Sequence, residues 1–282
     1  MPPKLGILAG GGTLPALLVD TCIRSQRPFF VIAFAGQADA ALVAPRPDGR
    51  PVPHAWVRLG AAGRTVKLLR REGAAELVMA GRMRRPALMT LRPDLWALRF
   101  LLRHCGLKRG DDALLRALIE ALGDEGFAVV GVDSLLPDLL APVGVLGAVQ
   151  PDAAALADVR LGIGAALSIG ARDVGQAAVA RHGRVIGREG REGTDALLAA
   201  CAGERPAVPS GVLVKMAKPG QERRVDLPAI GPGTVAAAAR AGLAGIAVEA
   251  GGALLVERDG LIAAADAAGL FVLGVEAAER RP

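Results

Sequence analysis

The sequence contains no tyrosine, and only two tryptophans and six phenylalanines occur among its 282 residues. Proteins that bind single-stranded nucleic acid without sequence preference use several aromatic side chains as stacking platforms. We therefore expect no nucleic-acid partner. The net charge of +6 still suits an anionic membrane surface or an acidic substrate.

Cysteine and histidine are also scarce. The three cysteines, Cys22, Cys105 and Cys201, are far apart and odd in number, which argues against a disulfide framework and a structural zinc site. The three histidines lie in three separate regions, which disfavours the histidine-rich centre of a two-metal phosphoesterase. This pattern predicts a reduced, cytoplasmic protein.

Long uninterrupted apolar runs are missing as well. No window reaches the roughly 18 apolar residues that a membrane-spanning helix needs. The apolar stretch after Lys4 is broken by three glycines and Pro15, and no small-residue cleavage site follows, so it does not resemble a signal peptide.

The apolar content of 52% is ample for two hydrophobic cores. Strand-like and helix-like segments alternate in both halves, which predicts an α/β protein of two α/β domains with a cleft between them. The N-terminal nucleotide-binding domain, 1–133, has a Rossmann-like βαβ start. An apolar linker, 134–150, leads to a catalytic C-terminal domain with a mixed sheet, 151–282.

The βαβ start contains a glycine loop, Gly10 to Thr13, between a strand over 5–9 and a helix over 14–25. Backbone N–H groups of Gly11, Gly12 and Thr13 can approach an anion at such a helix N-terminus. The dinucleotide motif is not met, because Pro15 stands where a third glycine belongs and the next strand ends without an acidic residue. Alternatively, the glycines only allow strand and helix to pack closely.

A second irregular segment, 215–234, lies between a strand over 210–216 and a helix that Thr234 can cap. Glycine and proline interrupt it repeatedly, which predicts a shaped loop. It carries four cations and two carboxylates: Lys215, Lys218, Arg223, Arg224, Glu222 and Asp226. A site that binds phosphate groups together with a divalent metal needs such a set, because carboxylate oxygens hold the metal and Lys or Arg side chains neutralise the phosphates. Alternatively, Asp226 pairs with Arg223 or Arg224 on a solvated loop.

Two further features favour anion binding. Arginines concentrate from Arg82 to Arg109, where they would meet a diphosphate or an anionic lipid, or simply form a solvated helix face. Thr194 and Asp195 open a helix, where either residue caps the helix or the free N–H groups meet a ligand. Asp111 and Asp112 are expected to cap the helix over 113–122.

Eight motifs occur in the order that resembles the LpxI family of UDP-2,3-diacylglucosamine pyrophosphatases: ILAGGGTLP, AGRMRRPALMTLRPD, SLLPDLLAPVG, DVGQA, EGTDALL, GVLVKMAKPGQERRVDLPAIGPGTV, AGLAGIAVEAG and GLFVLGV. The resemblance covers nearly the whole chain. It implies Mg²⁺-dependent hydrolysis of UDP-2,3-diacylglucosamine to UMP and lipid X, with water attacking the phosphorus nearer the sugar. It also implies a homodimer.

The resemblance implies that Asp226, in the motif RVDLP, is the catalytic carboxylate and a metal ligand. The predicted substrate-binding residues are Gly11, Gly12, Thr13, Arg82, Thr194, Asp195, Lys215, Gln221 and Arg223. Apolar segments 135–149 and 161–169 either line a chamber for the acyl chains or pack the core. Peripheral contact with the inner membrane is a further expectation. The alternative function is a non-catalytic nucleotide-sugar-binding or regulatory protein.

Overall fold

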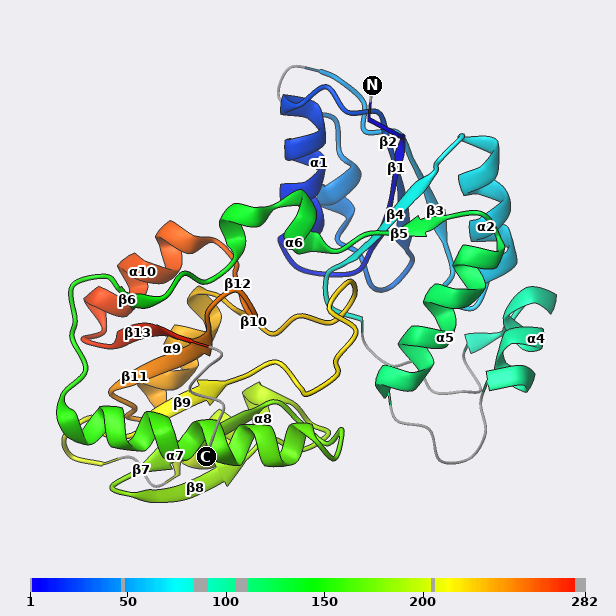
Figure 1. Ribbon diagram of the computed structural model, residues 1–282. Coiled ribbons are helices and arrows are strands. Elements are labelled where there is room, and N and C mark those ends of the chain that lie inside the picture. Colours follow the sequence, from blue (N-terminus) through cyan, green and yellow to red (C-terminus); the bar gives the residue numbers. More distant parts are fainter. Residues whose placement is uncertain (1, 47–48, 84–90, 105–110, 204–205, 277–282) are drawn as a thin grey trace. The chain divides into compact units, whose positions relative to one another are not determined.

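The computed structural model describes residues 2–46, 49–83, 91–104, 111–203 and 206–276 (Figure 1). Cys105 and much of the arginine-rich stretch from Arg82 to Arg109, namely residues 84–90 and 105–109, lie outside this set. The chain divides into two compact units. Unit 1 comprises Met1–Pro137 and Glu222–Val225, and unit 2 comprises Asp138–Gln221 and Asp226–Pro282.

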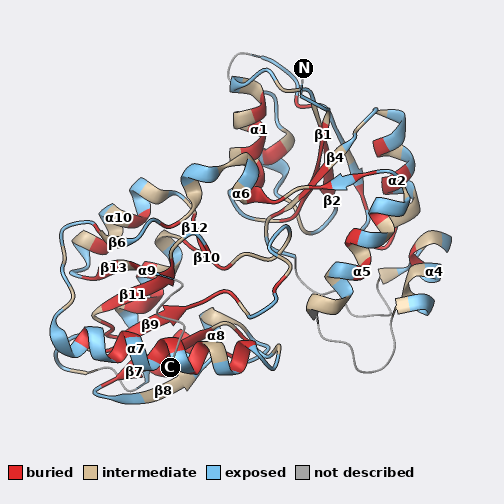
Figure 2. Ribbon diagram, in the orientation of Figure 1, coloured by how far each residue is buried: buried red, intermediate tan, exposed pale blue. Residues whose placement is uncertain are grey.

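Unit 1 contains a five-stranded sheet of order β3-β2-β1-β4-β5, paired in parallel throughout. Its strands are β1 (Leu5–Ala9), β2 (Phe29–Phe34), β3 (His54–Val57), β4 (Glu76–Ala80) and β5 (Ala128–Val129). β1 is buried along its whole length (Figure 2), as expected for a parallel sheet whose two faces are covered. The chain runs outward from β1 to β3 and then returns to β4 on the other side of β1, so the carboxyl ends of β1 and β4 form a topological switch point.

The helices of unit 1 are α1 (Leu14–Arg24), the short η1 (Ala40–Val43), α2 (Ala62–Arg71), α4 (Leu95–His104), α5 (Asp111–Asp124) and α6 (Val132–Leu135). Apolar residues of α2 and α5 pack with β2, β4 and the segment before β5 in one core, which includes Leu69, Leu77, Ile119 and Phe127. The predicted strand over 5–9 and helix over 14–25 agree with β1 and α1 nearly to the residue, whereas β3, an edge strand in which only Val57 is buried, was not predicted.

Unit 2 contains a six-stranded mixed sheet of order β6-β13-β11-β9-β7-β8 and a two-stranded sheet of β10 and β12. The strands are β6 (Gly144–Leu146), β7 (Ala177–Arg181), β8 (Arg184–Arg188), β9 (Val212–Lys215), β10 (Ala229–Ile230), β11 (Gly245–Glu249), β12 (Leu254–Leu255) and β13 (Phe271–Val275). β6 pairs antiparallel with β13, so part of the predicted linker belongs to this sheet. β7 and β8 form an antiparallel hairpin whose turn residues, His182 and Gly183, are both at positive φ, as a type I′ turn requires.

The helices of unit 2 are α7 (Ala153–Gly170), α8 (Thr194–Ala202), α9 (Pro232–Arg240) and α10 (Arg258–Ala267), and the short η2 (Pro137–Leu139) spans the boundary between the units. Among the described helices, α7 alone is long and apolar enough to cross a membrane, and half of it is buried. Its residues Ile163, Ala166 and Ile169 pack with Val214 in the core of unit 2. These three side chains therefore take the packing role rather than that of a chamber wall.

We expected Thr234 to cap α9, but the N-cap is Gly231. The helix begins at Pro232 behind Gly231, and the Thr234 hydroxyl reaches back to the Gly231 N–H at 3.4 Å. Proline at the first helical position sets the start earlier, because its fixed φ suits the helix and its missing N–H costs nothing there.

Candidate active site

At the switch point of unit 1, two glycine-containing turns pack backbone to backbone. Gly11 and Arg82 form an isolated antiparallel bridge, with N–O distances of 2.9 and 2.8 Å. A β-carbon at Gly10 would lie 2.5 Å from the Arg82 carbonyl oxygen, and one at Gly11 would lie 2.8 Å from that of Gln37. The structure thus supports close packing as a reason for Gly10 and Gly11.

Gly12 is different. It is exposed, has φ of +90°, and a β-carbon there would meet no atom within 4 Å. Thr13 beside it is the N-cap of α1 but makes no side-chain capping bond. Gly12 and Thr13 therefore present backbone to solvent at a helix N-terminus, where N–H groups and the helix dipole favour an acceptor.

Asp39, which the sequence analysis did not single out, reaches this loop from beyond β2. Its Oδ2 lies 3.4 Å from the Gly12 nitrogen. We had noted that β2 ends without an acidic residue, but Asp39 follows shortly beyond the end of the strand, after residues 35–38. A carboxylate near the loop is suited to accept hydrogen bonds from ribose hydroxyls, as the acidic residue of nucleotide-binding βαβ units does.

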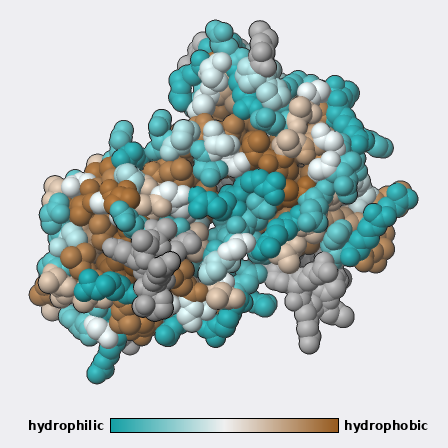
Figure 3. Space-filling view, viewed as in Figure 1, coloured by the Kyte–Doolittle hydropathy of each residue, from teal (hydrophilic) through white to brown (hydrophobic). Residues whose placement is uncertain are grey.

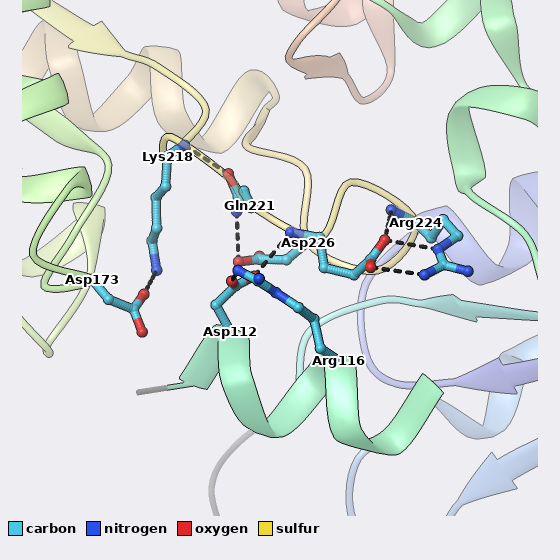
Figure 4. A network of polar contacts seen from close by, with 8 residues as sticks. Asp112, Arg116, Asp173, Lys218, Gln221, Arg224 and Asp226 are labelled. Atoms are coloured by element: carbon cyan, nitrogen blue, oxygen red, sulfur yellow. Dashed lines mark hydrogen bonds and ion pairs between the residues drawn. The ribbon is translucent and has the colours of Figure 1, made fainter. Parts of the chain in front are cut away.

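In unit 2, the loop that follows β9 is fixed at its base. Lys215 is buried, and its Nζ donates to the Ala229 carbonyl oxygen at 3.1 Å, which joins the two ends of the loop. The Ala217 N–H donates to the buried carboxylate of Glu249 at 3.0 Å. Lys218 pairs with Asp173 at 2.7 Å (Figure 4). The loop is therefore irregular but held in a defined shape.

Within this loop, Gln221 is buried and bonds to Asp226 (Figure 4). The Lys218 N–H donates to Gln221 Oε1 at 2.8 Å, and Gln221 Nε2 donates to Asp226 Oδ2 at 2.6 Å. Because a backbone N–H can only donate, it fixes which end of the amide faces Asp226. The neutral amide orients the Asp226 carboxylate without compensating its negative charge.

The segment 222–225 belongs to unit 1, although the residues on both sides belong to unit 2. Arg224 binds Glu222 through two bonds of 2.8 Å, and this pairing lowers the pKa of the Glu222 carboxyl and raises that of Arg224. The Glu222 N–H donates to Asp112, and Val225 packs against the unit 1 core. Arg224 thus pairs with Glu222.

Asp112 does not cap α5, because α5 begins at Asp111 and the Asp112 carboxylate instead accepts from the Glu222 N–H and pairs with Arg116. Arg223 is exposed and lies in the same segment of unit 1 as Glu222.

Thr194 and Asp195 lie at the start of α8 as predicted, but neither is the N-cap, a position that Gly193 occupies. The Thr194 hydroxyl donates to Glu189 at 2.6 Å, and the other oxygen of this buried carboxylate accepts from the Gln176 N–H, also at 2.6 Å. Thr194 therefore ties α8 to the hairpin, while Asp195 is exposed in the first turn.

An open groove of about 690 Å³ runs between β8 and α8 in unit 2. Apolar side chains form part of it and arginines border it, and its lining residues include Ile186, Ala196, Leu197, Ala200, Arg188 and Arg191. The sequence analysis did not identify this groove, because the pairing of β8 with α8 is a tertiary contact.

The expected Mg²⁺ can be tested against the donors present. Among the described residues, no group of three or more histidine, cysteine, aspartate or glutamate side chains could hold a metal ion. A cage made only of protein ligands therefore does not fit the described donors. Magnesium is often held by one or two carboxylates together with substrate phosphates and water, and Asp226, with one oxygen oriented by Gln221, fits that mode.

The fold and these side chains define a two-unit α/β protein with an open glycine loop in a Rossmann-like unit and a carboxylate oriented by a neutral amide in a mixed-sheet unit. Family models match along nearly the whole chain: the LpxI N-terminal domain over residues 4–139 and the LpxI C-terminal domain over residues 142–273. The chain belongs to the LpxI family.

A curated relative supports this assignment. The chain is 42% identical over 284 aligned residues to the UDP-2,3-diacylglucosamine pyrophosphatase LpxI of Caulobacter vibrioides, covering 98% of this chain and 99% of the relative. Among solved structures, the Bordetella bronchiseptica enzyme WbmG in complex with NAD aligns over 45% of this chain and 36% of its own, with 14% identity. Its TM-score of 0.30 is too low to carry an argument.

Proposed function

We propose that the protein hydrolyses the pyrophosphate of UDP-2,3-diacylglucosamine to UMP and 2,3-diacylglucosamine 1-phosphate, with Mg²⁺. The similarity to the Caulobacter vibrioides enzyme over nearly the full length of both chains supports the substrate and the reaction class. The single structural observation that favours catalysis over simple binding is the Gln221–Asp226 bond of 2.6 Å. A protein that only bound a polyanionic ligand would gain nothing from an oriented negative charge beside it.

In this proposal, the Asp226 carboxylate accepts a hydrogen bond from the attacking water and so orients it. The water oxygen forms a bond to the phosphorus nearer the sugar and loses a proton, the bond between that phosphorus and the bridging oxygen breaks, and UMP leaves with the bridging oxygen. When bound, Mg²⁺ would neutralise phosphate charge and lower the pKa of water, and Asp226 is the residue that would hold it. Gln221 keeps the carboxylate in place.

The glycine loop is proposed to bind the nucleoside part of the substrate. The Asp39 carboxylate lies at the Gly12 N–H, where it would repel a phosphate but accept bonds from ribose hydroxyls. Arg82, which is exposed and bridged to Gly11, is proposed to compensate phosphate charge. Gly12, Thr13 and Asp39 thus give the loop a preference for the UMP half.

The groove between β8 and α8 is proposed to take an acyl chain. It offers apolar side chains beside polar surface, and removing a methylene from water is worth about 0.8 kcal/mol. Ala200→Trp would fill part of the groove and should raise KM for the diacyl substrate. The same change should leave the KM of a short-chain analogue nearly unaltered.

Incubation of the protein with UDP-2,3-diacylglucosamine in ¹⁸O-labelled water tests the proposal. We expect Mg²⁺-dependent release of UMP, with the label in the sugar phosphate. Release of unlabelled sugar phosphate and labelled UMP would show that water attacks the phosphorus nearer the nucleoside instead. Tight binding of intact substrate with no UMP would favour the alternative, a non-catalytic nucleotide-sugar-binding protein.

A further inference from the structure

Helix α4 of unit 1 (Leu95–His104) exposes three leucines on one face. Leu95 is 74% exposed, Leu98 43% and Leu102 78%. Their spacing of three and four residues places them in one stripe along the helix. Single exposed leucines are common on soluble proteins, but a continuous stripe marks an interaction surface.

The opposite face of α4 already has its partners. The rings of Trp96 and Phe100 stack with centroids 5.7 Å apart, and Phe100 lies 4.9 Å from the His104 ring. Trp96 Nε1 donates to Glu125 at 2.6 Å, and Ala97 is buried. The ring contacts lie within α4, but the Trp96–Glu125 bond and the burial of Ala97 tie this face to unit 1, so the leucine stripe cannot turn into the core without breaking them.

Positive charge accompanies the stripe. Arg99 and Arg103 are exposed on α4, adjacent to the leucines at helical spacing. The helix LWALRFLLRH contains no acidic residue, and Asp94 before it is engaged in bonds to the Ala97 and Arg64 N–H groups. Figure 3 shows apolar and polar surface side by side at the edge of unit 1 where Figure 1 draws α4.

We propose that α4 docks on an anionic membrane surface, with Leu95, Leu98 and Leu102 inserted at the headgroup boundary and Arg99 and Arg103 on lipid phosphates. Interfacial helices combine these two features. A second copy of the chain packed on this face in a two-fold dimer would bring like-charged arginines together, and nucleic acid would leave the leucines unused. Charge complementarity therefore favours the lipid surface. This inference is independent of the proposed hydrolase activity.

Co-sedimentation of the full chain with vesicles tests the proposal. We expect binding to phosphatidylcholine vesicles that contain about 30% phosphatidylglycerol and little binding to phosphatidylcholine alone. The double variant Leu95→Glu/Leu102→Glu should have an affinity for the anionic vesicles that is lower by about tenfold or more. Val208→Glu is the matched control, because Val208 is 75% exposed in unit 2, and it should bind like the wild type.

The charged half of the surface has its own control. Arg99→Gln/Arg103→Gln should remove the preference for anionic vesicles, whereas Arg160→Gln/Arg172→Gln, which removes two exposed arginines of unit 2, should not. Circular dichroism and thermal unfolding confirm that each variant is folded. The proposal is overturned if the wild type fails to bind anionic vesicles at low salt, or if Leu95→Glu/Leu102→Glu binds as well as the wild type. It is equally overturned if the wild type is a dimer that does not bind vesicles and Leu95→Glu/Leu102→Glu converts this dimer to a monomer.

Discussion

Gln221 and Asp226 are joined by a hydrogen bond of 2.6 Å from Nε2 to Oδ2, and the Lys218 N–H fixes the direction of the Gln221 amide. The carboxylate is thus positioned by a buried neutral donor. Arg224, one of the two arginines that seemed able to pair with Asp226, instead binds Glu222. The bond therefore singles out Asp226 among the carboxylates of the loop.

Replacing Gln221 by methionine should lower kcat by about 10- to 100-fold, because Asp226 would lose the partner that orients it. KM should change little, and thermal stability should fall modestly. Gln176→Met is the matched control, since Gln176 contacts Gln221 only at 3.4 Å and Asp226 keeps its bond. Equal losses of kcat in both variants would contradict an orienting role for Gln221.

Gln221→Glu tests the same bond through pH. The new carboxylate would face Asp226, and the two cannot both stay ionised at this distance at low cost. The acid limb of the kcat profile should therefore move to higher pH than in the wild type. An unshifted limb would show that Asp226 is not the group whose ionisation controls turnover.

Gly12→Ala should raise KM for the UDP-sugar, because the added methyl projects from an exposed loop proposed to bind the nucleoside. It should also cost about 1–2 kcal/mol in stability, the usual penalty for a side chain at positive φ. Gly73→Ala is matched, since Gly73 has φ of +69° and open space around its α-carbon. Both variants should lose similar stability, and only Gly12→Ala should change KM. An unchanged KM in Gly12→Ala would leave only structural reasons for the loop, namely close packing at Gly10 and Gly11 and positive φ at Gly12.

Glu222→Gln should leave turnover nearly intact and alter stability in a pH-dependent way. The Arg224 hydrogen bonds hold the pKa of Glu222 below its ordinary 4.5, so the folded state binds this proton less tightly than the unfolded state. The stabilisation is present above pH 4.5 and disappears as the pH falls through the lower folded-state pKa. Because 47% of the Arg224 side chain is exposed, the effect should stay under about 1 kcal/mol.

Urea unfolding of Glu222→Gln and the wild type between pH 3 and pH 7 measures this difference. The two stabilities should converge at the acid end. A gap that widens toward low pH would contradict the sign of the shift, and a large loss of turnover would move the catalytic role from Asp226 to Glu222.

Local patterns in the sequence were enough to predict the β1–α1–β2 unit and the loop after β9. Their signals are local, since buried apolar runs, glycine turns and helix caps act within a few residues. The overlooked features are non-local. β6 becomes a strand only by pairing with β13, and Asp39 reaches Gly12 from 27 residues away.

The same reason explains the partners within the loop after β9. Charge composition placed four cations near Asp226, but it could not assign Arg224 to Glu222, or Lys218 to Asp173. Nor could it predict that Glu222–Val225 belongs to unit 1. At Thr194 the sequence indicated the start of a helix, and the structure adds the bond from its hydroxyl to Glu189.

The most direct test of the account is the turnover of Asp226→Asn with UDP-2,3-diacylglucosamine and Mg²⁺, compared with Asp173→Asn, which removes the same charge from a partly buried ion pair in the same unit. Asp226→Asn keeps the size of the side chain and removes the charge, so kcat should fall by about 10²- to 10⁴-fold while substrate still binds and remains intact. Asp173→Asn should keep nearly full turnover. If Asp226→Asn keeps more than about a tenth of the wild-type kcat, a loss under ~1.4 kcal/mol, Asp226 is not the catalytic carboxylate.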